Sequence, residues 1–425
     1  MVARIGAFRA FPRSERLWIA FAALLLSMAP ARSEPALAQP APGSGWTDAD
    51  KWAWSKIESG QEADFDKREK CAPAPPADPE HKRDKAWDDP CRKVSAGFLQ
   101  DILTKAPWRE ATPFKGVFIT HAKVDGDIDL ENARLVRAFG IRDSLFDGAM
   151  KLMRAKTDGL IGLVGSLVSG MVNAASLHSG VSLLLMQSSF EGDLLLIGAK
   201  VAGQISIVDA SVSGTLKAEP IQAHDMFARG TKFEGDVKII FSEMSNNLDL
   251  RGAELTNLNL SNTSIGGELS LAGGSRQPLQ WKKVNDKPAI LNLRNAHVGG
   301  LVDTKEVWPS DGRLQLRLEG LKLDHLGGFE GGTGQEMRER GGWWDEWVRL
   351  DPDYSPAPYA QLVAVMKAAG DSDAADDIQF LGRERAREAI CTKDARSFNC
   401  ALQNVLGYAV GYGIGKYSFF ALSIG

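Results

Sequence analysis

A short repeat closed by glycine constrains the fold of this chain more than any other feature. From about Lys115 to Leu301 the sequence repeats every ten or eleven residues with the form apolar-x-apolar-x-x-(Ala/Ser)-x-apolar-x-Gly. Typical units are LIGLVGSLVSG, DLLLIGAKVAG and QISIVDASVSG. Ten of the units end in a glycine, namely Gly126, Gly159, Gly170, Gly180, Gly192, Gly203, Gly214, Gly235, Gly267 and Gly300.

The spacing within each unit predicts a β-helix. Two apolar residues separated by one position point to the same side of a strand, and the unit is too short for the helical crossover of an ordinary parallel sheet. Alanine or serine would fit where the wall turns inward, and glycine would supply the permissive backbone of the next corner. Two units, about 20–22 residues, would make one coil that stacks at about 4.8 Å on the next. We therefore expect a mainly β fold, a right-handed parallel β-helix of about nine coils.

An up-and-down β-barrel or a β-sandwich also uses short strands separated by turns. Hairpin signals between the expected strands are weak, with Asp-Gly at 125–126, 147–148 and 158–159. The repeat also keeps its phase through a dozen units, as repeat architectures do. Both observations favour the β-helix.

Residues 1–38 have the pattern of a secretory signal peptide. Four arginines precede an apolar run of twelve residues at 17–28, and residues 36–38 (ALA) form a small-x-small cleavage site. Twelve apolar residues are short for a membrane span, so we expect a cleaved signal, with an uncleaved N-terminal anchor as the alternative. Residues 39–45 would then be a spacer in an exported, periplasmic protein.

The four cysteines form two local pairs, Cys71 with Cys91 and Cys391 with Cys400. An exported protein meets an oxidising compartment, where such pairs form disulfides. A bridge between Cys71 and Cys91 would be worth about 3 kcal/mol by loop-closure arithmetic. Four free thiols are the alternative. The spacings do not match zinc pairs, whose cysteines usually lie about two to four residues apart.

Helical patterns flank the repeat. Residues 46–110 predict a helical N-terminal cap that contains the disulfide loop, because the end of a solenoid needs its edges and apolar side chains covered. We expect the β-helix over 111–330, a Gly/Trp-rich linker over 331–355 and a helical hairpin over 356–400. The tail, residues 401–425, is apolar with a single charge, and we expect it to lie near a membrane.

Acidic residues near the start of the repeat are the strongest candidates for chemistry. Asp125, Asp127 and Asp129 begin like a calcium loop, but Leu130 and Val136 occupy the positions that require glycine and a carboxylate. Within the repeat, Asp127 and Asp129 should point outward. They form either a solvated face or an acidic pair of the kind found in polysaccharide-cleaving β-helix enzymes. The weak surface candidates are Asp127, Asp129, Lys151 and Arg154.

The sequence carries no motif for a cofactor, a metal or nucleic acid. No Gly-x-Gly-x-x-Gly lies between a strand and a helix, and the six histidines have no ligand spacing. The net charge is −4, so no large basic surface indicates nucleic acid. We expect no cofactor, no metal site and no nucleic-acid partner.

Three blocks carry a resemblance: KVSAGFLQDILT with the following KGVFITHAKVDGDIDLENA, the glycine-closed repeat, and SPAPYAQLVAVMKAAGDSDAADDIQFLGRERAR followed by VGYGIGKY. Through them most of residues 92–420 resembles bacterial pentapeptide-repeat-like β-helix proteins, some of which bear the loose label membrane-associated oxidoreductase. The resemblance implies a β-helix, a C-terminal helical hairpin and a membrane anchor near the C-terminus, and it brings no catalytic residues. Similar proteins usually continue into a hydrophobic span, so this chain is expected to be a truncated version.

A regular repeat without a convergent polar cluster favours a non-catalytic scaffold that presents a wall to an envelope protein or polysaccharide. The alternatives are a carbohydrate-active β-helix enzyme and a membrane-anchored sensor or accessory protein that uses the tail. Interruptions of the repeat at 138–149, 215–232 and 272–289 are where we expect any function on the β-helix to lie.

Overall fold

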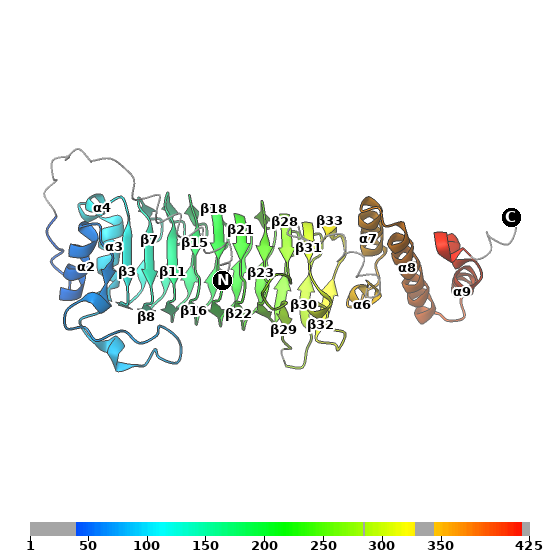
Figure 1. Cartoon of the computed structure of the whole chain (residues 1–425), viewed down its shortest axis with the longest axis horizontal. Coiled ribbons are helices and arrows are strands. Elements are labelled where there is room, and N and C mark those ends of the chain that lie inside the picture. The colour runs from blue at the N-terminus through cyan, green and yellow to red at the C-terminus, as the bar shows by residue number, and fades with distance from the viewer. Residues whose placement is uncertain (1–39, 284, 328–343, 419–425) are drawn as a thin grey trace, which may run out of the picture. The chain divides into compact units, whose positions relative to one another are not determined.

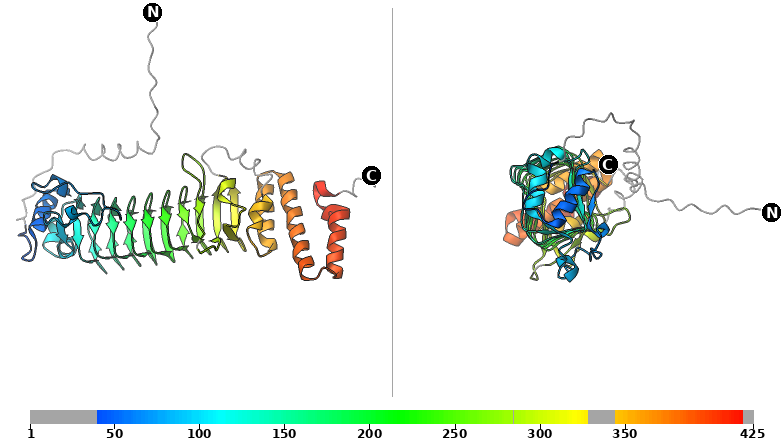
Figure 2. Two further views of the ribbon diagram at one scale, coloured as in Figure 1. Left: turned by 90° about the horizontal axis from the view of Figure 1, so that it is seen from below. Right: turned by 90° about the vertical axis from the view of Figure 1, so that its left-hand side faces the viewer.

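The computed structural model describes residues 40–283, 285–327 and 344–418. Its main feature is a parallel β-solenoid of about ten turns (Figure 1), with ten stacked positions on one wall between Val117 and Leu326. This confirms the mainly β, parallel β-helix that the repeat predicts. Each coil has four walls, and the coils have a four-sided outline when viewed along the stack (Figure 2).

The first and fourth walls belong to one sheet, because several strands continue around the corner between them. The first wall comprises β3 (Val117–Thr120), β7 (Phe139–Arg142), β11 (Ile161–Val164), β15 (Leu183–Leu184), β25 (Leu248–Asp249) and the second halves of the long strands. The fourth wall comprises β6 (Arg134–Leu135), β10 (Lys156–Thr157), β14 (His178–Ser179), β24 (Glu243–Met244) and the first halves of the long strands. The long strands are β18 (Ala199–Ser206), β21 (Ile221–Phe227), β28 (Ser264–Ser270), β31 (His297–Val302) and β33 (Lys322–Leu326).

The second and third walls are separate nine-stranded sheets. The second contains β2 (Lys93–Ser95), β4 (Lys123–Asp125), β8 (Leu145–Phe146), β12 (Leu167–Val168), β16 (Ser189–Phe190), β19 (Ser211–Val212), β22 (Lys232–Phe233), β26 (Glu254–Leu255) and β29 (Gln280–Trp281). The third contains β5 (Ile128–Asp129), β9 (Met150–Lys151), β13 (Val172–Asn173), β17 (Leu194–Leu195), β20 (Leu216–Ala218), β23 (Val237–Ile239), β27 (Asn257–Asn259), β30 (Ala289–Asn292) and β32 (Leu314–Arg317).

Contacts between neighbouring coils give the length of a coil. Equivalent positions are separated by 22 in the chain where Ser144 bonds to Ser166, and by 21 where Ile221 bonds to Ser242. Two sequence units therefore make one coil, as expected. The expected interruption at 138–149 keeps the register of its neighbours and is regular. The one at 272–289 is an insertion, because Leu269 pairs with Leu301, well beyond the length of an ordinary coil.

Large and small side chains alternate in the column that the second wall points into the core. A phenylalanine on one coil lies next to a valine on the coils before and after it, and both are buried. Alternation lets the rings interdigitate without voids at the fixed spacing of the coils. The column reads Val124, Phe146, Val168, Phe190, Val212 and Phe233.

The glycines that close the units serve a different purpose from the one we expected. Of the ten, only Gly126 has a positive φ. Close approach of the neighbouring coil explains the others, since a Cβ on Gly192 would lie 2.8 Å from the backbone carbon of Gly170. One on Gly214 would lie 2.6 Å from that of Gly192. The corners with positive φ are mostly formed by other residue types, such as Asn132 and Gln187.

A column of buried serines holds the corner between the first and second walls. The Ser166 hydroxyl accepts the backbone N–H of Ser144 at 3.2 Å and donates to the carbonyl of Val164 at 3.1 Å. Ser188 repeats the pattern one coil later, accepting from Ser166 at 3.1 Å. Where the small residue is a serine, its hydroxyl thus gives corner amides a partner that the bent backbone does not provide.

The N-terminal cap covers one end of the core, and its helices confirm the expected helical segment. It contains α2 (Asp48–Glu58), β1 (Ala63–Asp64), η1 (Phe65–Lys67), η2 (Lys85–Asp88), α3 (Ala96–Thr104) and α4 (Trp108–Ala111). Trp54 and Phe98 continue the apolar core beyond the first coil. Asp50 is fully buried and accepts both the N–H and the hydroxyl of Ser95 at 2.9 Å, which satisfies the edge of β2.

The C-terminal region is helical, as expected. After η3 (Lys305–Val307) it contains α6 (Trp344–Arg349), α7 (Pro356–Ala368), α8 (Ser372–Lys393), α9 (Phe398–Val410), η5 (Gly411–Gly413) and η6 (Gly415–Tyr417). Helices α7 and α8 pack together as a hairpin, and the side chain of Gln361 donates to the Leu323 carbonyl at 2.8 Å. The expected boundary between hairpin and tail at residue 401 falls inside α9.

Some expected segments lie outside the described residues. The signal peptide (1–38), the first residue of the spacer, residues 331–343 of the linker and the last seven residues of the tail belong to this group.

Candidate functional site

A groove of about 590 Å³ crosses the fourth wall over β10, β14, β18, β21 and β24. Its lining residues come from five successive coils, so it runs along the stack instead of into the core. Apart from Val201, the residues that line it are small or polar. Thr157, Ser179 and Ala223 point inward and are nearly buried, and Gly180 and Ala202 lie beside them. Because these side chains are small, the outer surface of the fourth wall is recessed at these positions.

A backbone irregularity lies in the groove. Between Val201 and Gln204 the pairing of β18 with β21 shifts register, so that β18 carries one residue more than its partner. On the fourth wall, residues of neighbouring coils are 22 apart before this point, as in His178 and Lys200, and 21 apart just after it, as in Gln222 and Glu243. Bulges of this kind re-aim side chains and are common next to functional sites. The expected interruption at 215–232 therefore coincides with one side of the groove.

Four basic side chains form a column, the basic ladder, on successive coils of the fourth wall. Arg134, Lys156, His178 and Lys200 are in register and exposed. Strand spacing sets about 4.8 Å between one member and the next. Arg134 lies 3.7 Å from Asp158, and the Nδ1 atom of His178 lies 3.0 Å from the carbonyl oxygen of Ser176. Neither Lys156 nor Lys200 has an ion pair with any described residue.

The other end of the groove is uncharged or acidic. Gln222 and Glu243 continue the column after Lys200. Beside them, a hydrogen bond of 2.8 Å joins Nδ1 of His224 to the hydroxyl of Ser245. Asp225 lies 3.8 Å from the other ring nitrogen.

The Ser245–His224–Asp225 group only partly matches a catalytic triad. A triad needs the carboxylate hydrogen-bonded to the histidine so that it orients the ring. Here the distance of 3.8 Å is too long, and one Asp225 oxygen already accepts from Asn246 and Asn247 at 2.9 and 3.0 Å. The buried carboxylate therefore holds the next coil in place.

Two of the candidate residues from the sequence, Asp127 and Lys151, form an ion pair of 2.8 Å on the third wall. Asp127 also accepts the backbone N–H of Ala149 at 2.8 Å. The hydrogen bond from Lys151 and then that from Ala149 lower the pKa of the Asp127 carboxyl. Asp193 makes the same contact with the N–H of Thr215 at 2.8 Å. Asp127 thus shares a repeated structural role in pairing the amides of the next coil.

The other two candidates do not join that pair. Asp129 pairs in register with Lys151, yet its carboxylate accepts the nearby N–H of Glu131 at 3.0 Å. Arg154 lies at the corner after β9 and donates to Asn132 at 2.6 Å. The four weak candidates therefore form one ion pair and two separate surface contacts.

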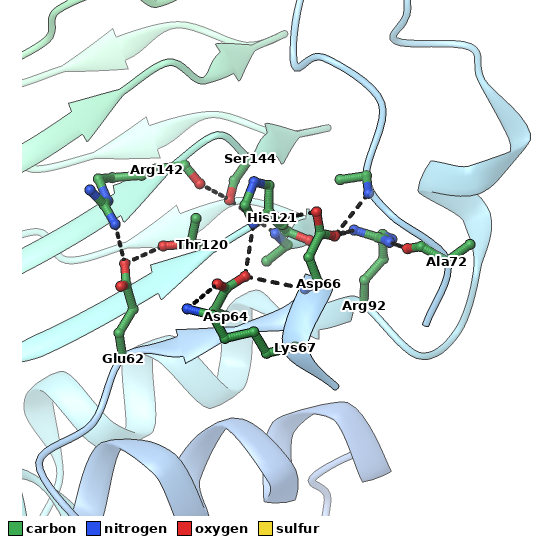
Figure 3. Close-up of polar contacts among 12 residues, drawn as sticks. Glu62, Asp64, Asp66, Lys67, Ala72, Arg92, Thr120, His121, Arg142 and Ser144 are labelled. Carbon is green, nitrogen blue, oxygen red and sulfur yellow. Dashed lines mark hydrogen bonds and ion pairs between the residues drawn. The ribbon is translucent and has the colours of Figure 1, made fainter. Parts of the chain in front are cut away.

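A polar cluster joins the N-terminal cap to the first coils (Figure 3). Glu62 accepts hydrogen bonds from Thr120 and from Arg142, the latter at 2.7 Å. Asp64 lies 2.8 Å from Nδ1 of His121 and 2.9 Å from Lys67. Burial raises the pKa of the Asp64 carboxyl, but the hydrogen bonds from Lys67 and His121 outweigh it and hold the pKa below its usual value. These contacts fix the cap to the solenoid.

Arg92 completes the cluster and connects it to the disulfide loop. Its side chain is fully buried and donates to the carbonyls of His121, at 2.8 Å, and of Ala72. Trp87, also fully buried, packs from this loop onto Leu145 and Leu167 on the outside of the second wall. The loop therefore covers the outer face of the second wall over these coils.

Both expected disulfides are present, Cys71–Cys91 and Cys391–Cys400. They are compatible with an exported protein in an oxidising compartment. In the described part of the chain, no helix combines the length and the apolar character needed to cross a membrane. Within the same residues, no three histidine, cysteine or acidic side chains gather closely enough to hold a metal ion.

Comparison with protein-family models, with curated proteins and with solved structures finds no match to this chain. The candidate site therefore depends on its geometry alone. None of the four members of the basic ladder is among the surface candidates from the sequence, and the groove was not predicted. A signal exists, because the four residues recur in the sequence at a constant interval of one coil.

Proposed function

We propose that this chain is an exported, non-catalytic β-solenoid scaffold that presents its fourth wall to a polysaccharide or protein of the cell envelope. The observation that carries the proposal is the groove with its basic ladder, which spans several coils. A surface of this kind suits an extended partner, because solenoids bind along their stacked repeats.

Further observations support the proposal. Two disulfides suit a protein that works outside the cytoplasm. The resemblance of the repeat and the α7–α8 hairpin to pentapeptide-repeat-like β-helix proteins agrees with a scaffold, since it brings no catalytic residues. The disulfide loop covers part of the second wall, and the third is crossed by the Asp127–Lys151 ion pair. The fourth wall is thus the best candidate for a binding surface.

The test is a binding panel with the full exported chain, both disulfides formed. Immobilised acidic and neutral polysaccharides, peptidoglycan and purified envelope proteins are each incubated with the chain, and the supernatant is assayed for new reducing ends and unsaturated sugars. Retention on at least one partner without new products is the expected result. Turnover of a polysaccharide, or no retention on any partner, would contradict the proposal.

One observation favours a carbohydrate-active enzyme as the second candidate, namely the hydrogen bond between His224 and Ser245 in the groove. Such a pair could activate a serine hydroxyl for attack on an ester of an acylated sugar. The assay is release of acetate from an acetylated polysaccharide by the wild type and by Ser245→Ala. Release that disappears in the variant would replace the scaffold proposal with this one.

A further inference from the structure

Two members of the basic ladder, Lys156 and Lys200, have no ion pair with a described residue, whereas Arg134 lies 3.7 Å from Asp158. On the second wall Lys93 and Lys123 are also stacked in register, but both pair with Asp88, at 3.6 and 2.9 Å. On the fourth wall Lys156 and Lys200 lie on either side of His178 without such a partner among the described residues. Lys156 also lies directly opposite Arg134 in the pairing of β10 with β6, and like charges directly opposite each other destabilise a sheet. Departures from local stability rules are expected at functional sites.

The spacing of the ladder points to a periodic ligand. Its members recur once per coil at about 4.8 Å, because they are attached to a hydrogen-bonded stack of strands. A polymer that carries one anionic group on each repeating unit can place a charge on every member. An extended acidic polysaccharide, with one carboxylate on each sugar, has this property.

The lining of the groove differs from that of a channel for single-stranded nucleic acid. Nucleic-acid channels combine basic residues with aromatic side chains on which the bases stack. None of the described residues that line this groove is aromatic other than histidine. Its lining includes the small residues Ser179, Gly180 and Ala202, which leave room for a sugar ring beside the charges.

We propose that the fourth-wall groove binds an extended acidic polysaccharide, with successive sugar carboxylates on Lys156, His178 and Lys200. This inference rests on the proposed function and gives its ligand class. Arg134 extends the charged end, where Asp158 competes for it at 3.7 Å. At the other end, Gln222 and Ser245 offer hydrogen bonds to sugar hydroxyls. The acidic side chain of Glu243 lies beyond the last member of the basic ladder. The polymer therefore lies along the stack, across the strands.

The experiment measures binding of polygalacturonate to the full chain by isothermal titration calorimetry. The variant Lys156→Gln/Lys200→Gln is compared with Lys217→Gln/Lys238→Gln, an in-register lysine pair on the third wall that makes the same charge change outside the groove. We expect at least about a tenfold loss of affinity in the first variant, because two charge-assisted hydrogen bonds are removed, and no loss in the second. Equal losses would overturn the proposal.

A third variant tests shape with the charges unchanged. Ala202→Phe places a ring in the groove at an exposed position. We expect it to weaken polygalacturonate binding by about tenfold or more, as loss of the preformed cavity removes most sugar contacts, while the thermal unfolding midpoint stays unchanged. Unchanged affinity would show that polygalacturonate does not bind in the groove.

A comparison of different polymers distinguishes failure of this proposal from failure of the proposed function. Binding of polygalacturonate that weakens with salt, with no binding of dextran, is the expected result. Equal binding of dextran would overturn the role of the ladder, and tighter binding of oligo-dT would replace the polysaccharide with nucleic acid. If a neutral polysaccharide or a protein binds and polygalacturonate does not, this inference fails and the scaffold stands. If no partner binds, both fail.

Discussion

At the scale of single residues, the glycines at the ends of the units act through their size. All but Gly126 have backbone angles that other residues adopt. Most of them are needed because the backbone of the adjacent coil approaches the space where a Cβ would lie, and at Gly300 the His325 side chain does so. This requirement follows from how coils stack, so a single unit of the sequence does not reveal it.

Replacement of Gly192 by alanine tests this explanation. The added Cβ would lie 2.8 Å from the backbone of Gly170, so we expect the free energy of unfolding to fall by about 1–3 kcal/mol, as for an overpacked core. Gly97→Ala, in helix α3 with no atom within 4 Å of the added carbon, is the control. It should leave stability equal or raise it by up to about 1 kcal/mol. Urea denaturation measures both, and equal destabilisation would contradict the explanation.

The basic ladder shows what sequence reasoning could have found at this scale. Arg134, Lys156, His178 and Lys200 form one column as soon as the chain is written with one coil to a row. The unit of ten or eleven residues fixes the coil only to within a few residues, and an error of one residue turns an outward side chain inward. The sequence indicates Asp127 and Lys151 as surface candidates, but their ion pair depends on the register of β5 with β9.

At the scale of elements, the N-terminal cap is fixed by carboxylates that the first coils hold in their charged form. The pKa of Asp64 in the folded chain lies below its unfolded value. The stabilisation from this carboxylate is therefore fully present above the unfolded pKa, about 4, and is lost as the pH falls through the folded value.

The variant Asp64→Asn tests this pH dependence. We expect the wild type to exceed the variant in unfolding free energy at pH 7, and the difference to shrink as the pH falls below about 4. Asp129→Asn, an exposed carboxylate outside the cap, should change stability by less than about 0.5 kcal/mol. Urea denaturation across this pH range gives the curves. A difference between wild type and Asp64→Asn that grows in acid would contradict the assignment.

The disulfide loop is the second element with a testable role. Its Trp87 covers Leu145 and Leu167, and the Cys71–Cys91 bridge closes it over a sequence separation of 20. We expect Cys71→Ala/Cys91→Ala to lose about 3 kcal/mol of stability and to become sensitive to trypsin at Lys82, Arg83 and Lys85. Cys391→Ala/Cys400→Ala should leave those sites protected. Protection in both variants would show that packing alone holds the loop.

The sequence predicted the disulfide pairs correctly, because each pair is local and the chain has only four cysteines. It did not predict where the loop packs. Leu145 and Leu167 occupy outward positions of the second wall. Their apolar character is explained only by the packing of Trp87 over them. In the same way, the tail was expected from its apolar composition, whereas the helix α9 begins at Phe398, after the N-cap Ser397.

At the scale of the whole solenoid, the four walls share one core and differ in their outer faces. The second wall is covered over several coils by the disulfide loop, the third carries the Asp127–Lys151 ion pair, and the fourth is hollowed along the basic ladder. The repeat predicts the core, since inward positions recur in every unit. Outer faces vary from coil to coil, so a binding surface arises only from their stacking.

The most direct measurement is lysine acetylation followed by mass spectrometry, with and without polygalacturonate. Lys156 and Lys200 of the fourth wall are compared with Lys217 and Lys238 of the third wall within the same molecule. We predict that bound polymer slows acetylation of Lys156 and Lys200 several-fold and leaves Lys217 and Lys238 unchanged. Equal protection on both walls, or protection confined to the third, would contradict the assignment of the fourth wall as the binding surface.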